Sequence, residues 1–210
     1  MANPVNWQRE MEKTLADLPE GARPRLLLHA CCGPCSSAVL EQLRRRFDIT
    51  ILYYNPNIWP EAEYRRRADE LAAFVARFAP EGDVELVEDR YLPDEFYAAA
   101  RGLEEEPERG ARCTRCYALR LERAAEFAAQ HGFDYVCTTL SISPHKDAER
   151  LNRLGMAAAE RQGVRWLPGD FKKKEGYKRS LQLSSEYGLY RQDYCGCVFS
   201  KRERENVKID

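Results

Sequence analysis

Short apolar runs alternate with longer segments of helical periodicity along this chain. The apolar runs have the length of buried strands and end at turn-forming residues; they cover residues 25–30, 49–54, 84–87, 135–140 and 164–167. Between these runs, apolar residues recur every three or four positions, which predicts helices. The helices cover residues 60–78, 113–130 and 147–162, with one more directly after residues 36–37 and another at the start of 93–112. This alternation predicts an α/β fold, a three-layer, mostly parallel sheet flanked by helices.

The loops that follow the predicted strands indicate where a site would form. Residues 31–35, 55–57 and 141–144 each come directly after a strand. In open α/β sheets, ligands bind beyond the carboxyl ends of the strands. We therefore expect these three loops to lie together at one edge of the sheet. Ser36 or Ser37 is expected to cap the helix after the first strand.

Composition narrows the class of protein. The chain has 210 residues, of which 44% are hydrophobic and 32% charged, so it can bury a core and is not a disordered chain. Its apolar runs fall short of the ~20 residues that a membrane helix needs. Residues 1–14 are polar and mixed in charge, unlike a signal peptide, so we expect a cytoplasmic protein. The net charge of −1 neither favours nor excludes nucleic acid.

The cysteines are the strongest chemical signal in the sequence. The chain has eight, and seven of them fall into three groups: Cys31, Cys32 and Cys35; Cys113 and Cys116; Cys195 and Cys197. In a reducing compartment, clustered cysteines point to metal ligands or redox groups rather than structural disulfides. The eighth, Cys137, lies alone in an apolar strand, where packing in the core is expected.

The spacing of the cysteines favours a metal centre. Cys113 and Cys116 are three residues apart at the start of a predicted helix, so both sulfurs lie on one face of its first turn. The helix amino terminus, Arg112 and Arg115 are expected to favour thiolates there. A structural zinc site needs only four sulfurs. Seven clustered sulfurs exceed that number and suit a [4Fe–4S] cluster with a second metal or a redox-active pair.

Six motifs in the same order resemble the QueH family of epoxyqueuosine reductases. They are LLHACCGPCSS (26–37), YYNPNIWPEAEYRRR (53–67), RCTRCYALRLERAA (112–125), TTLSISPHKD (138–147), GDFKKKEGY (169–177) and LYRQDYCGCVFS (189–200). The resemblance extends from about residue 25 to residue 204. We accordingly expect a helical lead-in at 1–24, a single α/β catalytic domain with the metal site at 25–204, and a tail at 205–210.

The resemblance implies an activity, a cofactor and a fold. It implies an iron–sulfur oxidoreductase that reduces epoxyqueuosine in the tRNA wobble position to queuosine, the last step of queuosine biosynthesis. The implied fold is similar to adenine-nucleotide α-hydrolase-like (HUP) proteins. The implied [4Fe–4S] ligands are Cys31, Cys32, Cys113 and Cys116.

The remaining cysteines have two implied roles. Cys195 and Cys197 resemble either the redox pair of the family or the ligands of a second mononuclear iron or zinc. The position of Cys35 is Asp in some members of the family, and both residue types bind metals. Cys35 is therefore a candidate ligand for the second metal.

Removal of an epoxide oxygen requires two electrons and two protons and releases water. A [4Fe–4S] cluster transfers one electron at a time, so a second store is useful, and an external low-potential electron donor is expected. The strain in a disulfide between Cys195 and Cys197 would make it easy to reduce. Lys146 is the candidate for a catalytic, substrate or phosphate contact, and His145 is its neighbour on the predicted edge.

Local charge and aromatic residues suggest a surface for tRNA. The basic runs 65–67 and 172–174 lie close in sequence to the site motifs, where neutralisation of phosphates is expected. An unpaired anticodon base can stack on an aromatic ring, for which Trp59 is the best candidate. The candidate substrate-binding residues are Asn55, Asn57, Trp59, Arg65, Lys146, Lys172 and Lys173.

Two other functions compete with this interpretation. A tRNA sulfurtransferase of the same fold class would need a Ser- and Gly-rich loop for ATP after the first strand, where this chain has CCGPCSS. A zinc-stabilised RNA-binding module would use four cysteines and no redox chemistry. Binding of ATP separates the first alternative from a reductase, and the identity of the metal separates the second.

Overall fold

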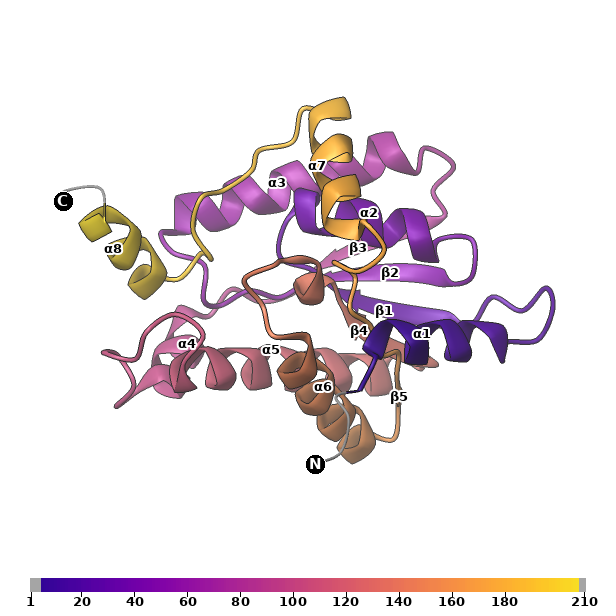
Figure 1. The fold of residues 1–210 in the computed structure, drawn as a ribbon, viewed down its shortest axis with the longest axis horizontal. Helices are drawn as coiled ribbons and strands as arrows, with labels where there is room; N and C mark the ends of the chain where they lie inside the picture. Colours follow the sequence, from indigo (N-terminus) through magenta and orange to yellow (C-terminus); the bar gives the residue numbers. More distant parts are fainter. Residues whose placement is uncertain (1–4, 208–210) are drawn as a thin grey trace.

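A parallel sheet of five strands forms the middle layer of residues 5–207, the part of the chain that the computed structural model describes (Figure 1). The strands are β1 (Arg25–His29), β2 (Asp48–Tyr53), β3 (Val84–Glu88), β4 (Tyr135–Thr138) and β5 (Arg165–Trp166). Their order across the sheet is β3-β2-β1-β4-β5, and each neighbouring pair is parallel. The predicted α/β class and parallel sheet are therefore confirmed.

Helices cover both faces of the sheet (Figure 1). One face carries α2 (Gly33–Leu43), α3 (Glu61–Phe78) and α7 (Gly176–Glu186), and the other carries α4 (Pro93–Ala100), α5 (Ala111–Gln130) and α6 (Ala148–Gln162). Helix α1 (Trp7–Ala16) packs against α6, and α8 (Val198–Val207) lies at the end of the molecule beside α4. Two apolar clusters, one on each face, fill the space between sheet and helices.

The strand predicted at 135–140 is too long, and the structure also gives the ends of the helix that starts at 93 and of the last helix. The strand predicted at 135–140 ends at Thr138, because the Thr138 hydroxyl accepts a hydrogen bond from the Leu140 N–H and starts a short 3₁₀ helix, η1 (Thr139–Ile142). Helix α4 ends at Ala100, and residues 101–110 form a loop before α5. Residue 205, where we expected a tail, lies inside α8.

The expected serine cap is also wrong. Helix α2 begins one turn earlier than Ser36, with Cys32 as its N-cap. The backbone of Cys32 is extended, and its sulfur accepts a hydrogen bond from the Cys35 N–H at 3.3 Å. Ser36 and Ser37 instead donate to backbone carbonyls of the first turn. A cysteine of the first group thus also ends the loop after β1.

No helix within residues 5–207 is long and apolar enough to cross a membrane. Of the predicted lead-in, residues 1–4 lie outside the described part of the chain. Residues 208–210 of the predicted tail lie outside it as well.

Candidate metal centre

The chain topology directs the three cysteine groups to one edge of the sheet. The chain leaves β1 for β2 and β3 on one side and returns to β4 on the other, so β1 and β4 form the switch point of the sheet. Helix α2 begins directly after β1 at this edge. Helix α5 leads into β4 from the opposite direction, so its first turn lies at the same edge, as the carboxyl-end rule predicts.

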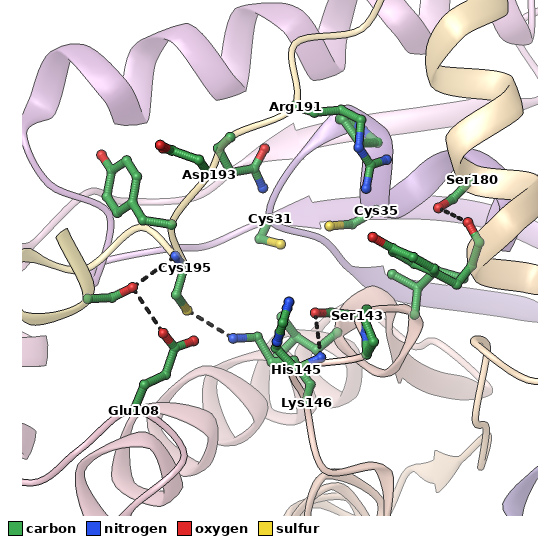
Figure 2. A pocket seen from close by; sticks show the side chains of 18 of the residues that line it. Cys31, Cys35, Glu108, Ser143, His145, Lys146, Ser180, Arg191, Asp193 and Cys195 are labelled. Atoms are coloured by element: carbon green, nitrogen blue, oxygen red, sulfur yellow. Dashed lines mark hydrogen bonds between the residues drawn. The ribbon is translucent and has the colours of Figure 1, made fainter. Parts of the chain in front are cut away.

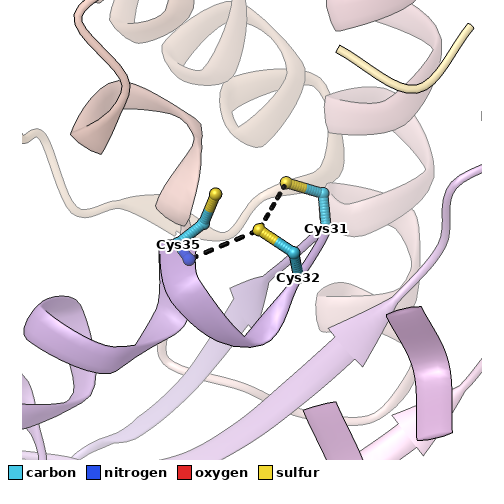
Figure 3. A group of neighbouring side chains, drawn as sticks. All are labelled: Cys31, Cys32 and Cys35. Atoms are coloured by element: carbon cyan, nitrogen blue, oxygen red, sulfur yellow. Dashed lines mark hydrogen bonds between the residues drawn. The ribbon is translucent and has the colours of Figure 1, made fainter. Parts of the chain in front are cut away.

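Cys31, Cys32 and Cys35 form the first group (Figure 3). Their three sulfurs all lie within 4.8 Å of one another, and the Cys31 and Cys32 sulfurs are 3.8 Å apart. Cys31 and Cys32 are buried, and Cys35 is half-buried at the first turn of α2. Three soft sulfur ligands at this spacing are suited to a thiophilic metal such as iron or zinc.

Cys113 joins this group from α5. It packs in one apolar cluster with Cys31 and Cys32, and Cys35 borders that cluster. The Arg109 backbone N–H donates to the Cys113 sulfur at 3.2 Å. Cys113 thus shares an apolar cluster with Cys31 and Cys32, but the sulfurs close enough to one another to bind a single metal ion, among the described residues, are those of Cys31, Cys32 and Cys35.

Cys116 and Cys197 meet in a neighbouring cluster. The sulfur of Cys197 accepts a hydrogen bond from the Ser200 N–H at 3.4 Å. Gly196 has a φ of +124°. A Cβ at this position would lie 3.0 Å from Nη1 of Arg67, so the turn between Cys195 and Cys197 requires glycine. This arrangement sets the Cys-Gly-Cys turn beside the first turn of α5. Within residues 5–207, all eight cysteines are free thiols.

Burial controls the ionisation of most of these thiols. It raises the pKa of Cys113, and it raises the pKa of Cys116 to about 11. Burial outweighs the Arg109 backbone N–H, Lys146 and Arg112, each of which lowers the pKa of Cys113, so the expected thiolate is not favoured without a metal. The Arg112 guanidinium donates to Glu203 and to the carbonyl of Glu104.

Among the three clustered sulfurs after β1, one is favoured as a thiolate, that of Cys31. Hydrogen bonds from Cys32 and Cys35 hold the pKa of Cys31 well below its usual range. Burial raises the pKa of Cys32 to about 12, and the hydrogen bond to Cys31 raises that of Cys35. A bound metal replaces these protons when the thiolates coordinate it.

A cavity of about 490 Å³ opens beside the cysteines (Figure 2). Cys31 and Cys35 reach it from the segment after β1, and Cys195 reaches it from the Cys-Gly-Cys turn. Its other walls come from η1 and the loop after it, from the loop before α5, from α7, and from the segment 191–195. The volume lies in the range of small-molecule sites, so the cavity can admit a nucleoside.

Lys146 lies at the contact between this cavity and the Cys-Gly-Cys turn. Its Nζ is 2.9 Å from the Cys195 sulfur and 5.5 Å from the centre of the Tyr117 ring (Figure 2). Burial opposes its charge, but attraction to Cys195 prevails and raises the pKa of Lys146 well above its usual value. Lys146 therefore keeps a proton beside the cysteines. The neighbouring His145 is exposed and bonded to Arg109.

His29 and Cys137 both lie in the interior, and for Cys137 this is the position expected from the sequence. His29 is fully buried, with Nε2 facing the Tyr54 carbonyl at 3.1 Å and Nδ1 facing the Thr138 hydroxyl at 2.9 Å. Since a carbonyl can only accept, Nε2 carries the proton. Burial and then Arg120 lower the pKa of His29 to about 3, so the ring is neutral. Cys137 is buried in the apolar cluster on the α2 face.

The structure corrects the expectation for two asparagines. Asn55 is fully buried, donates to the Ala30 carbonyl at 2.9 Å and accepts from Arg120 at 2.6 Å. Asn57 is 2% exposed. Neither lines the cavity. Asn55 thus joins the loop after β2 to the loop after β1, whereas the Asn57 amide oxygen is buried without a hydrogen-bond partner among the described residues.

The other predicted substrate contacts lie outside the cavity wall. Trp59 is 40% exposed and borders the Cys-Gly-Cys turn, because its N–H donates to the Gly196 carbonyl at 2.8 Å. Arg65 pairs with Glu61 and Glu88, and Lys172 pairs with Asp170. Lys173 is exposed. For these residues, contact with tRNA stays a prediction.

Several residues of the cavity wall escaped the sequence analysis. They are Arg109, Tyr177, Arg191, Gln192, Tyr194 and Arg204. Gln192 donates to the Cys32 sulfur at 3.3 Å, which ties the segment 191–195 to the first cysteine group. A signal was available, since this segment directly precedes Cys195 in a quoted motif. Its irregular backbone gave no periodicity from which to place it.

Fold and site together define a class of protein, an α/β protein with a cysteine-lined pocket at the switch point of its sheet. The family model described as "Epoxyqueuosine reductase QueH" matches residues 26–203. The chain belongs to the QueH family of epoxyqueuosine reductases.

Individual relatives agree with the family model. Two proteins named epoxyqueuosine reductase QueH, from Staphylococcus epidermidis and Streptococcus pyogenes, are each 43% identical to this chain. They match 93% and 94% of it, over 84% and 79% of their own lengths. A relative of the same name from Thermotoga maritima is 35% identical over 85% of this chain and 91% of its own.

A solved structure shares the fold. It is the U34-tRNA thiolase NcsA from Methanococcus maripaludis with its [4Fe-4S] cluster. The match has a TM-score of 0.50 at 13% identity and covers 96% of this chain and 70% of the thiolase. At this identity the match shows the fold alone.

Proposed function

We propose that this protein reduces epoxyqueuosine in the wobble position of tRNA to queuosine, the last step of queuosine biosynthesis. The observation that carries the proposal is the meeting of three separate cysteine groups beside one nucleoside-sized pocket. Membership of the QueH family identifies the substrate. With tRNA as substrate, we infer that the reaction takes place in the cytoplasm.

The donor set fits an iron–sulfur centre. The sulfurs of Cys31, Cys32 and Cys35 lie at spacings that a thiophilic metal can bridge, and Cys113 and Cys116 are buried free thiols on the adjacent first turn of α5. We propose that Cys31, Cys32, Cys113 and Cys116 hold a [4Fe–4S] cluster. Such a cluster supplies electrons one at a time. The related fold of a tRNA thiolase with a [4Fe-4S] cluster supports this choice.

We propose that Cys35, Cys195 and Cys197 form the site that stores the second electron. Cys35 is suited to a second mononuclear iron or zinc, because its sulfur lies within 4.8 Å of Cys31 and Cys32. Cys195 and Cys197 supply either ligands to that metal or a dithiol that is oxidised to a disulfide. The number of metal ions per chain distinguishes these two forms.

The chemistry balances with an external low-potential donor. Two electrons from the donor and two protons convert the epoxide to a carbon–carbon double bond and water. The Lys146 ammonium group lies at the cavity wall and next to Cys195, so we propose that it delivers a proton to the departing oxygen. Its buried position keeps this proton away from bulk water.

The cavity walls suit an anticodon nucleotide turned out of its loop. Arg109, Arg191 and Arg204 border the opening and can neutralise phosphates. Trp59, exposed beside the Cys-Gly-Cys turn, offers a ring for a neighbouring base. Extrusion of the base is needed because its reacting ring must reach the sulfurs.

The test is an anaerobic assay on the purified protein. Iron, zinc and acid-labile sulfide are counted, and the protein is then incubated with tRNA that contains epoxyqueuosine and with a chemical reductant. Mass spectrometry of the nucleosides should show loss of one oxygen atom from the modified base. A colourless, zinc-only protein without turnover would support an RNA-binding module, and ATP-dependent sulfur transfer would support a sulfurtransferase.

A further inference from the structure

Arg120 is a buried cation on the inner face of α5. Arg120 is 2% exposed. Within residues 5–207, its side-chain hydrogen-bond partners are the Asn55 amide oxygen, 2.6 Å from Nη2, and the Cys116 sulfur. Neither partner is a carboxylate, and Arg120 Nε has no partner in the described part of the chain. Since an unbalanced buried guanidinium is strongly unfavourable, this interior needs a negative charge.

The position of Arg120 links both sides of the cysteine site. It follows Cys116 by four residues on α5, so the two side chains share one face of the helix. On the other side, its partner Asn55 donates to the carbonyl of Ala30, the residue before Cys31. Arg120 thus contacts a cysteine of α5 directly and reaches the loop after β1 through Asn55.

Among the groups around Arg120, the cysteine sulfurs are the ones that can balance its positive charge. The two ring nitrogens of His29 face the Tyr54 carbonyl and the Thr138 hydroxyl, so the imidazole makes its hydrogen bonds with neutral groups. The other buried arginines near the cysteines have carboxylate partners: Arg67 binds Glu63 at 2.7 Å, and Arg112 binds Glu203 at 2.9 Å. For Arg120, the nearby sulfurs of Cys116, Cys31 and Cys195 are the groups that can carry the opposing negative charge.

We propose that Arg120 is the fixed counter-ion of the thiolate-bound redox centre and that its charge raises the reduction potential of that centre. The inference rests on the proposed function, because it requires a redox-active metal at these cysteines. An added electron makes the centre more negative, and a nearby cation in a low-dielectric interior stabilises that state. Arg120 is a positioning residue, since it acts through the metal centre and does not line the cavity.

The test measures the midpoint potential of anaerobically reconstituted protein by redox titration. In Arg120→Gln, the equilibrium constant for one-electron reduction should fall at least tenfold, which is a shift of about 59 mV to lower potential. Arg120→Lys keeps the charge and should stay close to wild type. Arg45→Gln, an exposed charge removal just beyond the far end of α2, is the matched control and should leave the potential unchanged.

A second variant neutralises Arg120 without removing it. Asn55→Asp places a carboxylate against the guanidinium with almost no change in volume, and it should lower the potential in the same direction. Without metal, Arg120→Gln should unfold at a temperature no lower than wild type, because it removes an unbalanced charge.

Specific outcomes overturn the inference. It fails if neither Arg120→Gln nor Asn55→Asp moves the potential, or if Arg120→Lys shifts it as far as Arg120→Gln. It also fails if metal-free Arg120→Gln does not fold, since Arg120 would then have a purely structural role. A wild-type protein without a redox-active metal instead overturns the proposed function itself.

Discussion

Cys137 and Cys197 have the same side chain but opposite surroundings. Cys137 is enclosed by apolar residues of the sheet, where its thiol replaces a small hydrophobic group. Cys197 lies in the Cys-Gly-Cys turn beside Cys116, and its sulfur accepts a backbone hydrogen bond. Residue type alone therefore does not define the site, and the two cysteines should respond differently to substitution.

We expect Cys197→Ser to retain its [4Fe–4S] cluster and lose turnover, because the hydroxyl cannot form a disulfide and is a poor ligand for a soft second metal. Cys137→Ala is the matched control and should keep both its metal content and its activity. Metal analysis and the anaerobic tRNA assay measure these properties. Normal turnover by Cys197→Ser would refute a role for the turn in electron storage.

Substitution of Lys146 tests the proposed proton transfer. Lys146→Met should lower kcat by about 10²- to 10⁴-fold, the usual effect of losing a general acid, with a smaller change in KM. Lys146→Arg retains the positive charge and should keep more of the activity than Lys146→Met. Lys178→Gln, at an exposed position on α7, provides a control. A raised KM at unchanged kcat would show that Lys146 only binds the substrate.

At the scale of elements, two contacts decide how helices lie on the sheet. Arg123 of α5 binds Asp89, the residue after β3, through two hydrogen bonds, and both side chains are largely buried. On the other side of the sheet's switch point, Gly155 of α6 lies directly against the Trp166 ring of β5. The first contact is electrostatic and the second is steric, so their contributions to stability are tested by different experiments.

The Asp89–Arg123 contact predicts a pH-dependent stability. Burial opposes ionisation of Asp89, but Arg123 outweighs it and lowers the pKa of Asp89 below its ordinary 3.8. A lowered pKa in the folded state contributes stability that is present above pH 3.8 and is lost as pH falls through the folded value. Asp89→Asn should therefore cost about 2 kcal/mol at pH 7.

The same comparison can be made in acid by denaturant titration. The difference in unfolding free energy between wild type and Asp89→Asn should shrink as the pH falls below 3.8. A difference that stays constant from pH 7 into this range would mean that the carboxylate charge contributes nothing.

Gly155 tests the packing of α6 on β5. A Cβ at this position would lie 2.4 Å from the Trp166 ring, which is too close for any side chain. Gly155→Ala should destabilise the protein by about 1–3 kcal/mol through overpacking, despite the better helix propensity of alanine. The exposed Met156→Ala on the same helix should change stability by less than about 0.5 kcal/mol. A stabilised Gly155→Ala variant would contradict this packing.

At the scale of the whole molecule, charge is distributed unevenly. The chain has a net charge of −1, yet Arg109, Arg191 and Arg204 all border the one cavity that the cysteines share. This placement favours a polyanion at the mouth of the site without making the protein basic overall.

Binding of tRNA should therefore depend on salt. Each phosphate contact with a single-stranded segment contributes about 0.7 to the slope of log K against log salt concentration. Arg191→Gln should weaken binding and reduce that slope by about this amount, whereas the distant Arg45→Gln should not. Binding measurements over a series of salt concentrations test this, and an unchanged slope would place Arg191 away from the RNA backbone.

How far the sequence predicts this protein depends on the kind of signal. The alternation of apolar runs with helical periodicity fixed the α/β class, because burial on both faces of a parallel sheet leaves a clear pattern. Element ends were less predictable: the Thr138 hydroxyl and the Cys32 sulfur form caps that compete with regular structure. Regular elements repeat a pattern, whereas caps depend on single side-chain contacts.

The sequence by itself determined the fold class, the cysteine groups and the family, because each is written in local spacing and order along the chain. Only the tertiary structure decided that Asn55 accepts a hydrogen bond from the buried Arg120 and that Lys146 reaches Cys195. It also decided that the segment 191–195 forms part of the pocket wall. These contacts join residues from 49 to 65 positions apart or involve an irregular loop. Such proximity follows from the packing of helices onto the sheet, which no local pattern encodes.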